Sequence, residues 1–271
     1  MSDKKIRLKD NYKKLLIIIA LLFAPFLVGH VFYETAIINA NALSSDAEKV
    51  EFSADFAYNH IYSFQYLFGY PFFRSGNDLL GFYVLGFSGC GELSYIQRCM
   101  LDRLGIEARP LVLLDDHEFN EVKVNGTWMV SDPGYADCHF LSTQERGQKR
   151  IEELGGLSVA YTIAPNGSIV WRTQDYVPVD WVTIRILNGA VSLSNCSITI
   201  SCTTSMTATL DEEGCITIPI GNLAGFKDGK TYLTVNVSGK EFKIESLGEG
   251  RHVEYVFNLM DSFFNQDSLF P

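Results

Sequence analysis

The sequence predicts a mixed α+β protein in three parts: a membrane-spanning helix, an α+β core and a small all-β sandwich. Residues 15–33 carry no ionised side chain. An amphipathic helical pattern at residues 90–104 is followed by runs that alternate between apolar and polar positions. After residue 179 the chain changes to short β-rich runs separated by turns. These patterns favour an anchor first, helices on an antiparallel sheet second and a sandwich last.

The N-terminal segment is basic and then apolar. Residues 1–14 have a net charge of +4, and the 19 residues that follow would span roughly 28 Å as a helix, about one bilayer core. Because basic flanks stay on the inner side, we expect a cytoplasmic tail at 1–14, a single-pass anchor at 15–33 and the remaining chain outside the cytoplasmic membrane. A cleaved secretion signal is the alternative, since Ala40-Asn41-Ala42 has the small-x-small form of a cleavage site.

Charge and composition exclude several classes of partner. The whole chain has a net charge of −10, so the part beyond the +4 tail carries −14. An acidic chain is a poor binder of nucleic acid. The sequence has no phosphate-binding loop and no cysteine pairs at metal-ligand spacing. We therefore expect no nucleic-acid partner, no metal and no cofactor.

The residues around Cys90 predict a helix with a reactive thiol at its start. Ser88 or Gly89 can serve as the N-cap, and Gly105 suits the left-handed residue that ends a helix. Cys90 then lies in the first turn, where free N–H groups and the helix dipole favour the thiolate over the thiol. Gly89 and Gly91 permit a substrate carbonyl to approach these N–H groups, which can act as an oxyanion hole. The apolar positions with helical spacing are Leu93, Ile96, Met100, Leu101 and Leu104.

A predicted hairpin supplies a histidine and a carboxylate. Residues 117–124 alternate and meet Asn125-Gly126, a preferred type I′ turn pair, so paired positions sum to 251. Phe119 then faces Asp132 across the hairpin. His117 and Asp132 become diagonal neighbours on one face, with Cβ atoms roughly 7 Å apart. Asp132 can therefore orient the imidazole of His117, and the second ring nitrogen remains available for a thiol.

Four segments in this order resemble the transglutaminase-like superfamily. They are Ser88-Gly89-Cys90-Gly91-Glu92, Leu104-Gly105-Ile106-Glu107-Ala108-Arg109, His117-Glu118-Phe119-Asn120-Glu121-Val122 and Gly126-Thr127-Trp128-Met129-Val130-Ser131-Asp132-Pro133. The resemblance implies a papain/transglutaminase-like core, with N-terminal helices packed on an antiparallel sheet. It makes Cys90 the nucleophile, His117 the general base and Asp132 the orienting carboxylate. Phe119 stands where the family usually has tryptophan, so the ring is kept and the indole N–H is lost.

Several neighbouring residues receive secondary roles. Ser88, Gly89, Gly91 and Phe119 are the candidates for oxyanion stabilisation or substrate contact. Asp115 and Asp116 precede His117, and we interpret them as a solvated loop. Arg109 is expected to have a structural role where its strand begins.

The domain boundaries follow from capping residues and turns. Ser44-Ser45-Asp46 offers N-cap residues, and we place the transglutaminase-like domain at 44–178. Residues 181–260 predict a small antiparallel, Ig-like sandwich, in which the run at 209–218 resembles the central hairpin of carboxypeptidase-regulatory modules. We expect an accessory role for this domain. Pairing among its three cysteines, Cys196, Cys202 and Cys215, stays open.

The resemblance and the triad together predict a function. We expect a membrane-anchored, extracytoplasmic cysteine enzyme that acts on peptide or side-chain amide bonds of a protein or peptide substrate through an acyl-enzyme. Hydrolysis is favoured because water needs no second binding site. Two alternatives remain: a catalytically inactive surface scaffold that binds peptide or polymer, and a true protein cross-linking transglutaminase.

Overall fold

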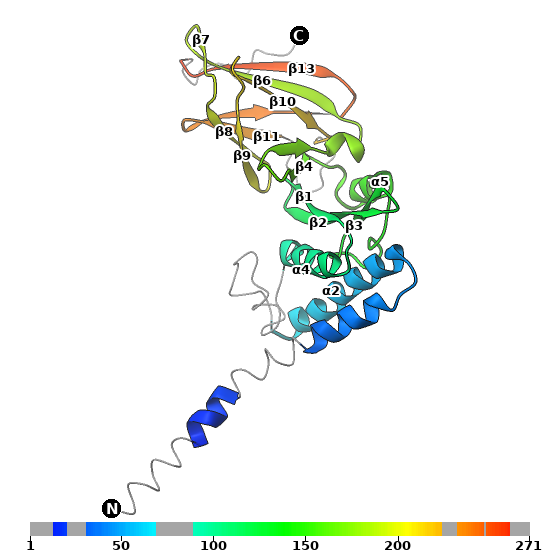
Figure 1. Ribbon diagram of the computed structural model, residues 1–271. Helices are drawn as coiled ribbons and strands as arrows, with labels where there is room; N and C mark the ends of the chain where they lie inside the picture. The colour runs from blue at the N-terminus through cyan, green and yellow to red at the C-terminus, as the bar shows by residue number, and fades with distance from the viewer. Residues whose placement is uncertain (1–12, 21–30, 69–88, 224–231, 247, 261–271) are drawn as a thin grey trace, which may run out of the picture. The chain divides into compact units, whose positions relative to one another are not determined.

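The computed structural model describes residues 13–20, 31–68, 89–223, 232–246 and 248–260 (Figure 1). Its helices and strands make a mixed α+β protein. The chain forms two compact units. The first unit contains Met1–Arg109 and Phe119–Phe140, and the second contains Pro110–Glu118 and Leu141–Pro271.

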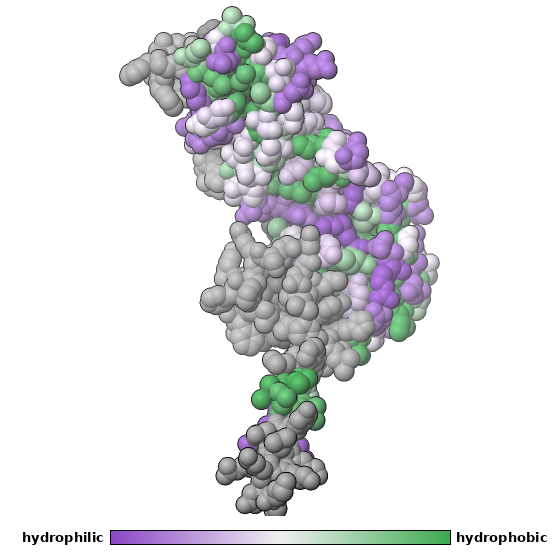
Figure 2. Space-filling model, turned by 60° about the vertical axis from the view of Figure 1, so that its left-hand side comes forward, coloured by the Kyte–Doolittle hydropathy of each residue, from purple (hydrophilic) through white to green (hydrophobic). Residues whose placement is uncertain are grey.

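The predicted membrane anchor is wrong. Within the described ranges, no helix is long and apolar enough to cross a membrane. Residues 13–20 and 31–41 are helical, whereas 21–30 and most of the basic tail lie outside the described residues. Figure 2 shows the apolar side chains of the first of these helices on the surface, and Leu15 to Ile19 are exposed. The predicted single-pass orientation depended on this span and is corrected with it.

The end of the predicted span belongs to a folded core, which explains the error. Tyr33 is only 5% exposed and packs edge-on against Phe56, with 6.3 Å between ring centroids. Glu34, one residue on, forms an ion pair with Arg103. Hydropathy alone does not distinguish residues that contact lipid from residues that pack on another helix. The mixed α+β class therefore stands without the transmembrane helix.

Two further helices of the first unit pack side by side (Figure 1). Helix α2 spans Asp46–Phe68, and its N-terminus is closed by Glu48, which accepts the N–H of Ser44 at 2.9 Å while Ser45 Oγ accepts the N–H of Glu48 at 3.2 Å. Helix α4 spans Cys90–Arg103, with Gly89 as its N-cap and Gly105 at φ +74° after its end. Both predicted limits of the second helix are confirmed.

A hairpin packs with these helices in the first unit. Strands β2 (His117–Val124) and β3 (Thr127–Ser131) pair from Asn120 with Ser131 to Val124 with Thr127, so the predicted register is confirmed. The turn residues Asn125 and Gly126 have φ of +51° and +79°, as a type I′ turn requires. The apolar core between the hairpin and the helices includes Val50, Leu101, Ile106, Val122 and Val124.

The remaining strands of this sheet belong mostly to the second unit. The strand order is β3-β2-β1-β4-β5, with β1 at Ala108–Leu113, β4 at Ala160–Ile163 and β5 at Ile169–Trp171. Helix α5 (Thr143–Leu154) begins at the N-cap Ser142, whose hydroxyl accepts the N–H of Glu145. A 3-10 turn, η1 (Thr173–Asp175), follows β5.

Two four-stranded sheets pack around one apolar core at the end of the chain (Figure 1). The first has the order β10-β6-β13, with β7 paired to β6, and the second has the order β12-β11-β8-β9. The strands are β6 (Asp180–Asn188), β7 (Val191–Ser192), β8 (Ser197–Ser201), β9 (Ser205–Thr209), β10 (Cys215–Ile220), β11 (Leu233–Val237), β12 (Lys240–Ile244) and β13 (His252–Asn258). The sandwich is not wholly antiparallel, because β13 runs parallel to β6.

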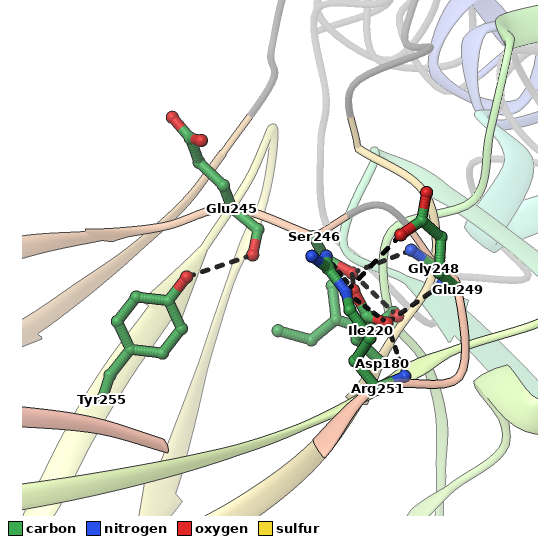
Figure 3. Close-up of polar contacts among 8 residues, drawn as sticks. All are labelled: Asp180, Ile220, Glu245, Ser246, Gly248, Glu249, Arg251 and Tyr255. Atoms are coloured by element: carbon green, nitrogen blue, oxygen red, sulfur yellow. Dashed lines mark hydrogen bonds and ion pairs between the residues drawn. The ribbon is translucent and has the colours of Figure 1, made fainter. Parts of the chain in front are cut away.

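A buried carboxylate explains this parallel pair (Figure 3). Asp180, the first residue of β6, accepts the backbone N–H groups of Glu249 and Arg251, each at 3.0 Å. Its second oxygen accepts Ser246 Oγ at 3.1 Å and Arg251 Nη2 at 2.8 Å. The chain before β13 is thus fastened where β6 begins, so the two strands start together and run in the same direction.

Candidate active site

Cys90 is the first residue of α4 and is partly exposed. Glu92 accepts the N–H of Gly89 at 2.8 Å, and the N–H of Leu93 donates to the Gly89 carbonyl at 3.1 Å. The first N–H groups of a helix have no acceptor within the helix, and those of Cys90 and Gly91 belong to this group. The thiol therefore lies at the positive end of a helix, next to backbone donors. Ser88 lies outside the described residues.

A buried amide pair joins α4 to the hairpin. Gln97 Nε2 donates to Ser131 Oγ at 2.6 Å, and Gln97 Oε1 accepts Asn120 Nδ2 at 2.7 Å. Asn120 Nδ2 also donates to the Ser94 carbonyl at 2.9 Å. These four residues are fully buried, and an unpaired amide there would cost about 1–3 kcal/mol. The amide pair therefore fixes α4 at one position along β2 and β3.

The network extends to α2 and to the surface. Gln97 Nε2 lies 3.3 Å from Ser53 Oγ on α2, and Arg98 Nη1 donates to Asn120 Oδ1 at 2.7 Å. Sequence reasoning missed Gln97 and Asn120. One signal was present, because Gln97 is four residues from both Leu93 and Leu101 and so lies on the apolar face of its helix.

Asp132 directly follows β3 and is fully buried. Its Oδ1 accepts the N–H of Gly134 at 3.0 Å, and its own N–H donates to the Cys138 carbonyl at 2.9 Å. Ser131 Oγ donates to the His139 carbonyl at 2.7 Å. Ser131 thus bonds both Gln97 and the returning loop, residues 132–139, which follows β3. The helix that begins with Cys90 and the strand that precedes Asp132 share one hydrogen-bond network.

The returning loop is also fastened to α2. His139 is 9% exposed, and its Nδ1 lies 3.0 Å from Asp55 Oδ1. The ring of Tyr58 packs edge-on against the imidazole, with 5.9 Å between centroids. These contacts hold the loop after Asp132 from its far end. Among the described residues, no group of three or more histidine, cysteine, aspartate or glutamate side chains could hold a metal ion.

His117 is the first residue of β2, is 8% exposed and belongs to the second unit. Asp116 before it has φ +71°, in the left-handed region, and is exposed as predicted. Asp115 was predicted to be solvated and is instead buried. Arg150 of α5 supplies its counter-charge, with Nη2 3.1 Å from Asp115 Oδ1. The structure therefore places Cys90 and Asp132 in the first unit and His117 in the second.

The other candidate substrate residues differ in exposure. Gly89 is exposed and Gly91 is partly buried, whereas the Phe119 side chain is 1% exposed. A Cβ built on Gly89 would meet the Glu92 carboxylate at 3.2 Å. Gly89 therefore leaves little room for a side chain beside the carboxylate that caps the helix.

Arg109 has the structural role that the sequence predicted. Its Nε donates to Glu121 Oε2 at 2.6 Å, and the Glu121 side chain is fully buried. The guanidinium lies over the ring of Trp128, 3.9 Å from the centroid. Arg109 thus balances a buried charge and covers an aromatic side chain of the hairpin.

Comparison with known proteins gives only weak similarity. No family model matches the chain, and no curated protein matches it. A solved structure described as "Crystal structure of a TGase" is similar with a TM-score of 0.31 and 19% sequence identity. The similarity covers 40% of this chain and 32% of that chain. The chain therefore spans about a third of that protein's length.

Proposed function

We propose that the protein is a transglutaminase-like cysteine enzyme that cleaves peptide or side-chain amide bonds. Cys90 is its nucleophile, His117 its general base and Asp132 the carboxylate that orients His117. One observation carries the proposal: the helix that begins with Cys90 is locked, through Gln97 and Ser131, to the strand that ends beside Asp132. A helix start with free N–H donors is the setting that a thiolate and an oxyanion need.

The reaction proceeds in two steps. His117 takes the proton of the Cys90 thiol, the sulfur attacks the amide carbonyl, and N–H groups of the first helical turn donate to the oxyanion. The His117 imidazolium gives its proton to the departing nitrogen, so the C–N bond breaks and a thioester remains. His117 then takes a proton from water, and the water oxygen attacks the thioester carbonyl. The C–S bond breaks to release the acid, and His117 returns the proton to the Cys90 sulfur.

The hairpin register supports the third member of the triad. The paired residues of β2 and β3 end at Asn120 with Ser131. One further step pairs Phe119 with Asp132. Because side chains alternate with a period of two, the proposal has His117 and Asp132 as diagonal neighbours on one face. The Cβ atoms of such diagonal neighbours lie roughly 7 Å apart, and an imidazole reaches a carboxylate across that distance.

The first experiment measures alkylation of each cysteine by iodoacetamide near neutral pH, with peptide mass spectrometry. We expect Cys90 to react faster than Cys99, a partly exposed thiol in the same helix, and faster than Cys215, whose pKa is raised by burial. His117→Ala should remove the advantage of Cys90. Equal rates at Cys90 and Cys99, unchanged by His117→Ala, would refute the triad.

A second experiment separates hydrolysis from amine transfer. A glutamine-containing peptide is incubated with and without a primary amine, and the products are weighed. If the enzyme hydrolyses the amide, the peptide in both mixtures gains the mass that separates an acid from an amide. A product that contains the amine would identify a transferase. If none of the amide substrates reacts, a binding scaffold is favoured.

A further inference from the structure

The loop that leads into His117 is held by the β-sandwich. The carbonyl of Leu114 accepts the backbone N–H groups of Thr203 and Thr204, each at 3.0 Å. The Thr204 hydroxyl lies 3.3 Å from the same carbonyl. Both threonines belong to the tight turn between β8 and β9, in which Cys202 N–H donates to the Thr204 carbonyl at 2.9 Å. One turn of the sandwich therefore binds Leu114, the residue directly after β1.

The same residue is part of the sandwich core. The Leu114 side chain is fully buried in the apolar cluster formed by the two sheets of the sandwich. Its N–H donates to the carbonyl of Val159, another member of that cluster, at 3.0 Å. Leu114 therefore has its side chain, its donor and its acceptor all engaged within the second unit.

Two residues, Asp115 and Asp116, separate Leu114 from His117, and Asp115 is also held in place. Asp115 is buried and paired with Arg150 at 3.1 Å. Asp116 then adopts the left-handed conformation, with φ +71°, and turns the chain into β2. Three residues of chain span at most about 11 Å, so a shift of Leu114 is passed to His117 with little slack.

We propose that the turn Cys202–Thr204 positions His117 for the proposed reaction. Thr203 and Thr204 are then positioning residues that act through Leu114, and the sandwich is a working part of the catalytic centre. This inference rests on the proposed role of His117 as the general base. It replaces the accessory role that the sequence suggested for residues 181–260.

The test removes one contact between Thr204 and the Leu114 carbonyl at a time, in the whole chain. Thr204→Pro deletes the N–H donor, Thr204→Val deletes only the hydroxyl, and Thr204→Ser keeps both. The matched control is Glu212→Pro, at an exposed turn of the same sandwich where proline suits the second position. The readouts are the alkylation rate of Cys90, its pH profile and amide hydrogen exchange of residues 110–120.

We expect Thr204→Pro to slow Cys90 alkylation by about tenfold or more, because small displacements of a catalytic group have large effects on rate. The pH profile of alkylation should approach that of the His117→Ala variant, and residues 114–118 should exchange faster. Thr204→Val should show a smaller loss, and Thr204→Ser and Glu212→Pro should behave like the unchanged protein. If Thr204→Pro does not fold, the Val and Ser variants still decide the question.

The possible failures are distinct. Faster exchange at residues 114–118 without any change in Cys90 alkylation would overturn the inference and leave the proposed function intact. Equal slowing by Thr204→Pro and Glu212→Pro would also overturn it, because the effect would then be general loss of stability. If His117→Ala leaves the alkylation rate unchanged, the proposed function itself fails.

Discussion

The two units hold their candidate catalytic residues with different chemistry. In the first unit, neutral amides and hydroxyls link α4 to the hairpin, and Gln97, Asn120 and Ser131 satisfy one another. In the second unit, the loop before His117 is held by a buried ion pair between Asp115 and Arg150. Among the described residues, Asp115 Oδ2 and Arg150 Nε have no hydrogen-bond partner.

This difference has an energetic consequence. A fully paired neutral network gives a definite position at small net energy. A buried ion pair must also offset the desolvation of both charges. Removal of one partner therefore leaves the other charge buried without a counter-charge, which is strongly destabilising. We therefore expect the nucleophile and the carboxylate to tolerate single substitutions in their supporting network better than the loop that carries His117.

Asp115→Leu should have the largest effect. Of the acidic side chains in the described part of the chain, it leaves Arg150, whose side chain is 4% exposed, with Glu153 alone, at 3.7 Å. We expect the free energy of unfolding of the second unit to fall by about 3–5 kcal/mol, as for other broken buried pairs. The double variant Asp115→Leu with Arg150→Met should recover most of this loss. Denaturant unfolding measures both, and a loss below about 1 kcal/mol in the single variant would contradict the comparison.

Gln97→Leu should cost less. The substitution removes the short hydrogen bonds to Ser131 and Asn120 and the longer ones to Ser53 and Val50. Asn120 keeps its bond to Ser94, and Ser131 keeps its bond to His139. We expect a loss of about 1–3 kcal/mol in the first unit and slower Cys90 alkylation. The matched control is Gln148→Leu on the exposed face of α5, which should change stability by less than about 0.5 kcal/mol. Equal effects at the two glutamines would refute a role for the buried amide pair.

The parts of the fold that local signals control were predictable from sequence. The Asn125-Gly126 pair defined both the turn and the register of the hairpin, and Gly89 and Gly105 marked the limits of α4. These features depend on residues a few positions apart. Backbone preferences and side-chain periodicity are sufficient to predict them.

Long-range pairings were not predictable. Arg150 meets Asp115 across 35 residues, and Arg251 meets Asp180 across 71. No local pattern states which distant partner a charged residue will find, so Asp115 was taken for a solvated residue and β13 for an antiparallel strand. The anchor was mispredicted for the same reason, since hydropathy does not reveal that Tyr33 packs on Phe56.

The two units also share a backbone feature whose substitution gives a smaller effect. Asn125 in the first unit and Asp116 in the second both have positive φ. Asp116→Val should lower the stability of the second unit by about 1–2 kcal/mol, because a β-branched residue disfavours the left-handed region. Asp116→Gly should change stability by less than about 1 kcal/mol, since strain relief and unfolded-state entropy oppose each other. Thermal unfolding distinguishes them, and equal effects would show that the conformation itself is unimportant.

The smallest effect concerns two helix starts that are alike in both units. Hydrogen bonds from Ser44 lower the pKa of Glu48 at the start of α2, and hydrogen bonds from Ser142 lower that of Glu145 at the start of α5. A lowered pKa in the folded state means that each carboxylate stabilises its helix above its ordinary value of 4.5, and that this contribution is lost as pH falls through the folded pKa. Protection of the amides in the first turns of α2 and α5, relative to unstructured amides at the same pH, should therefore fall below about pH 4.5. Glu48→Gln and Glu145→Gln should each flatten this dependence in their own helix only. Because both carboxylates are exposed, the loss of protection should be similar in α2 and α5. A clear difference between the two helices would show that packing within each unit, and not the capping carboxylate, controls how the first turn opens.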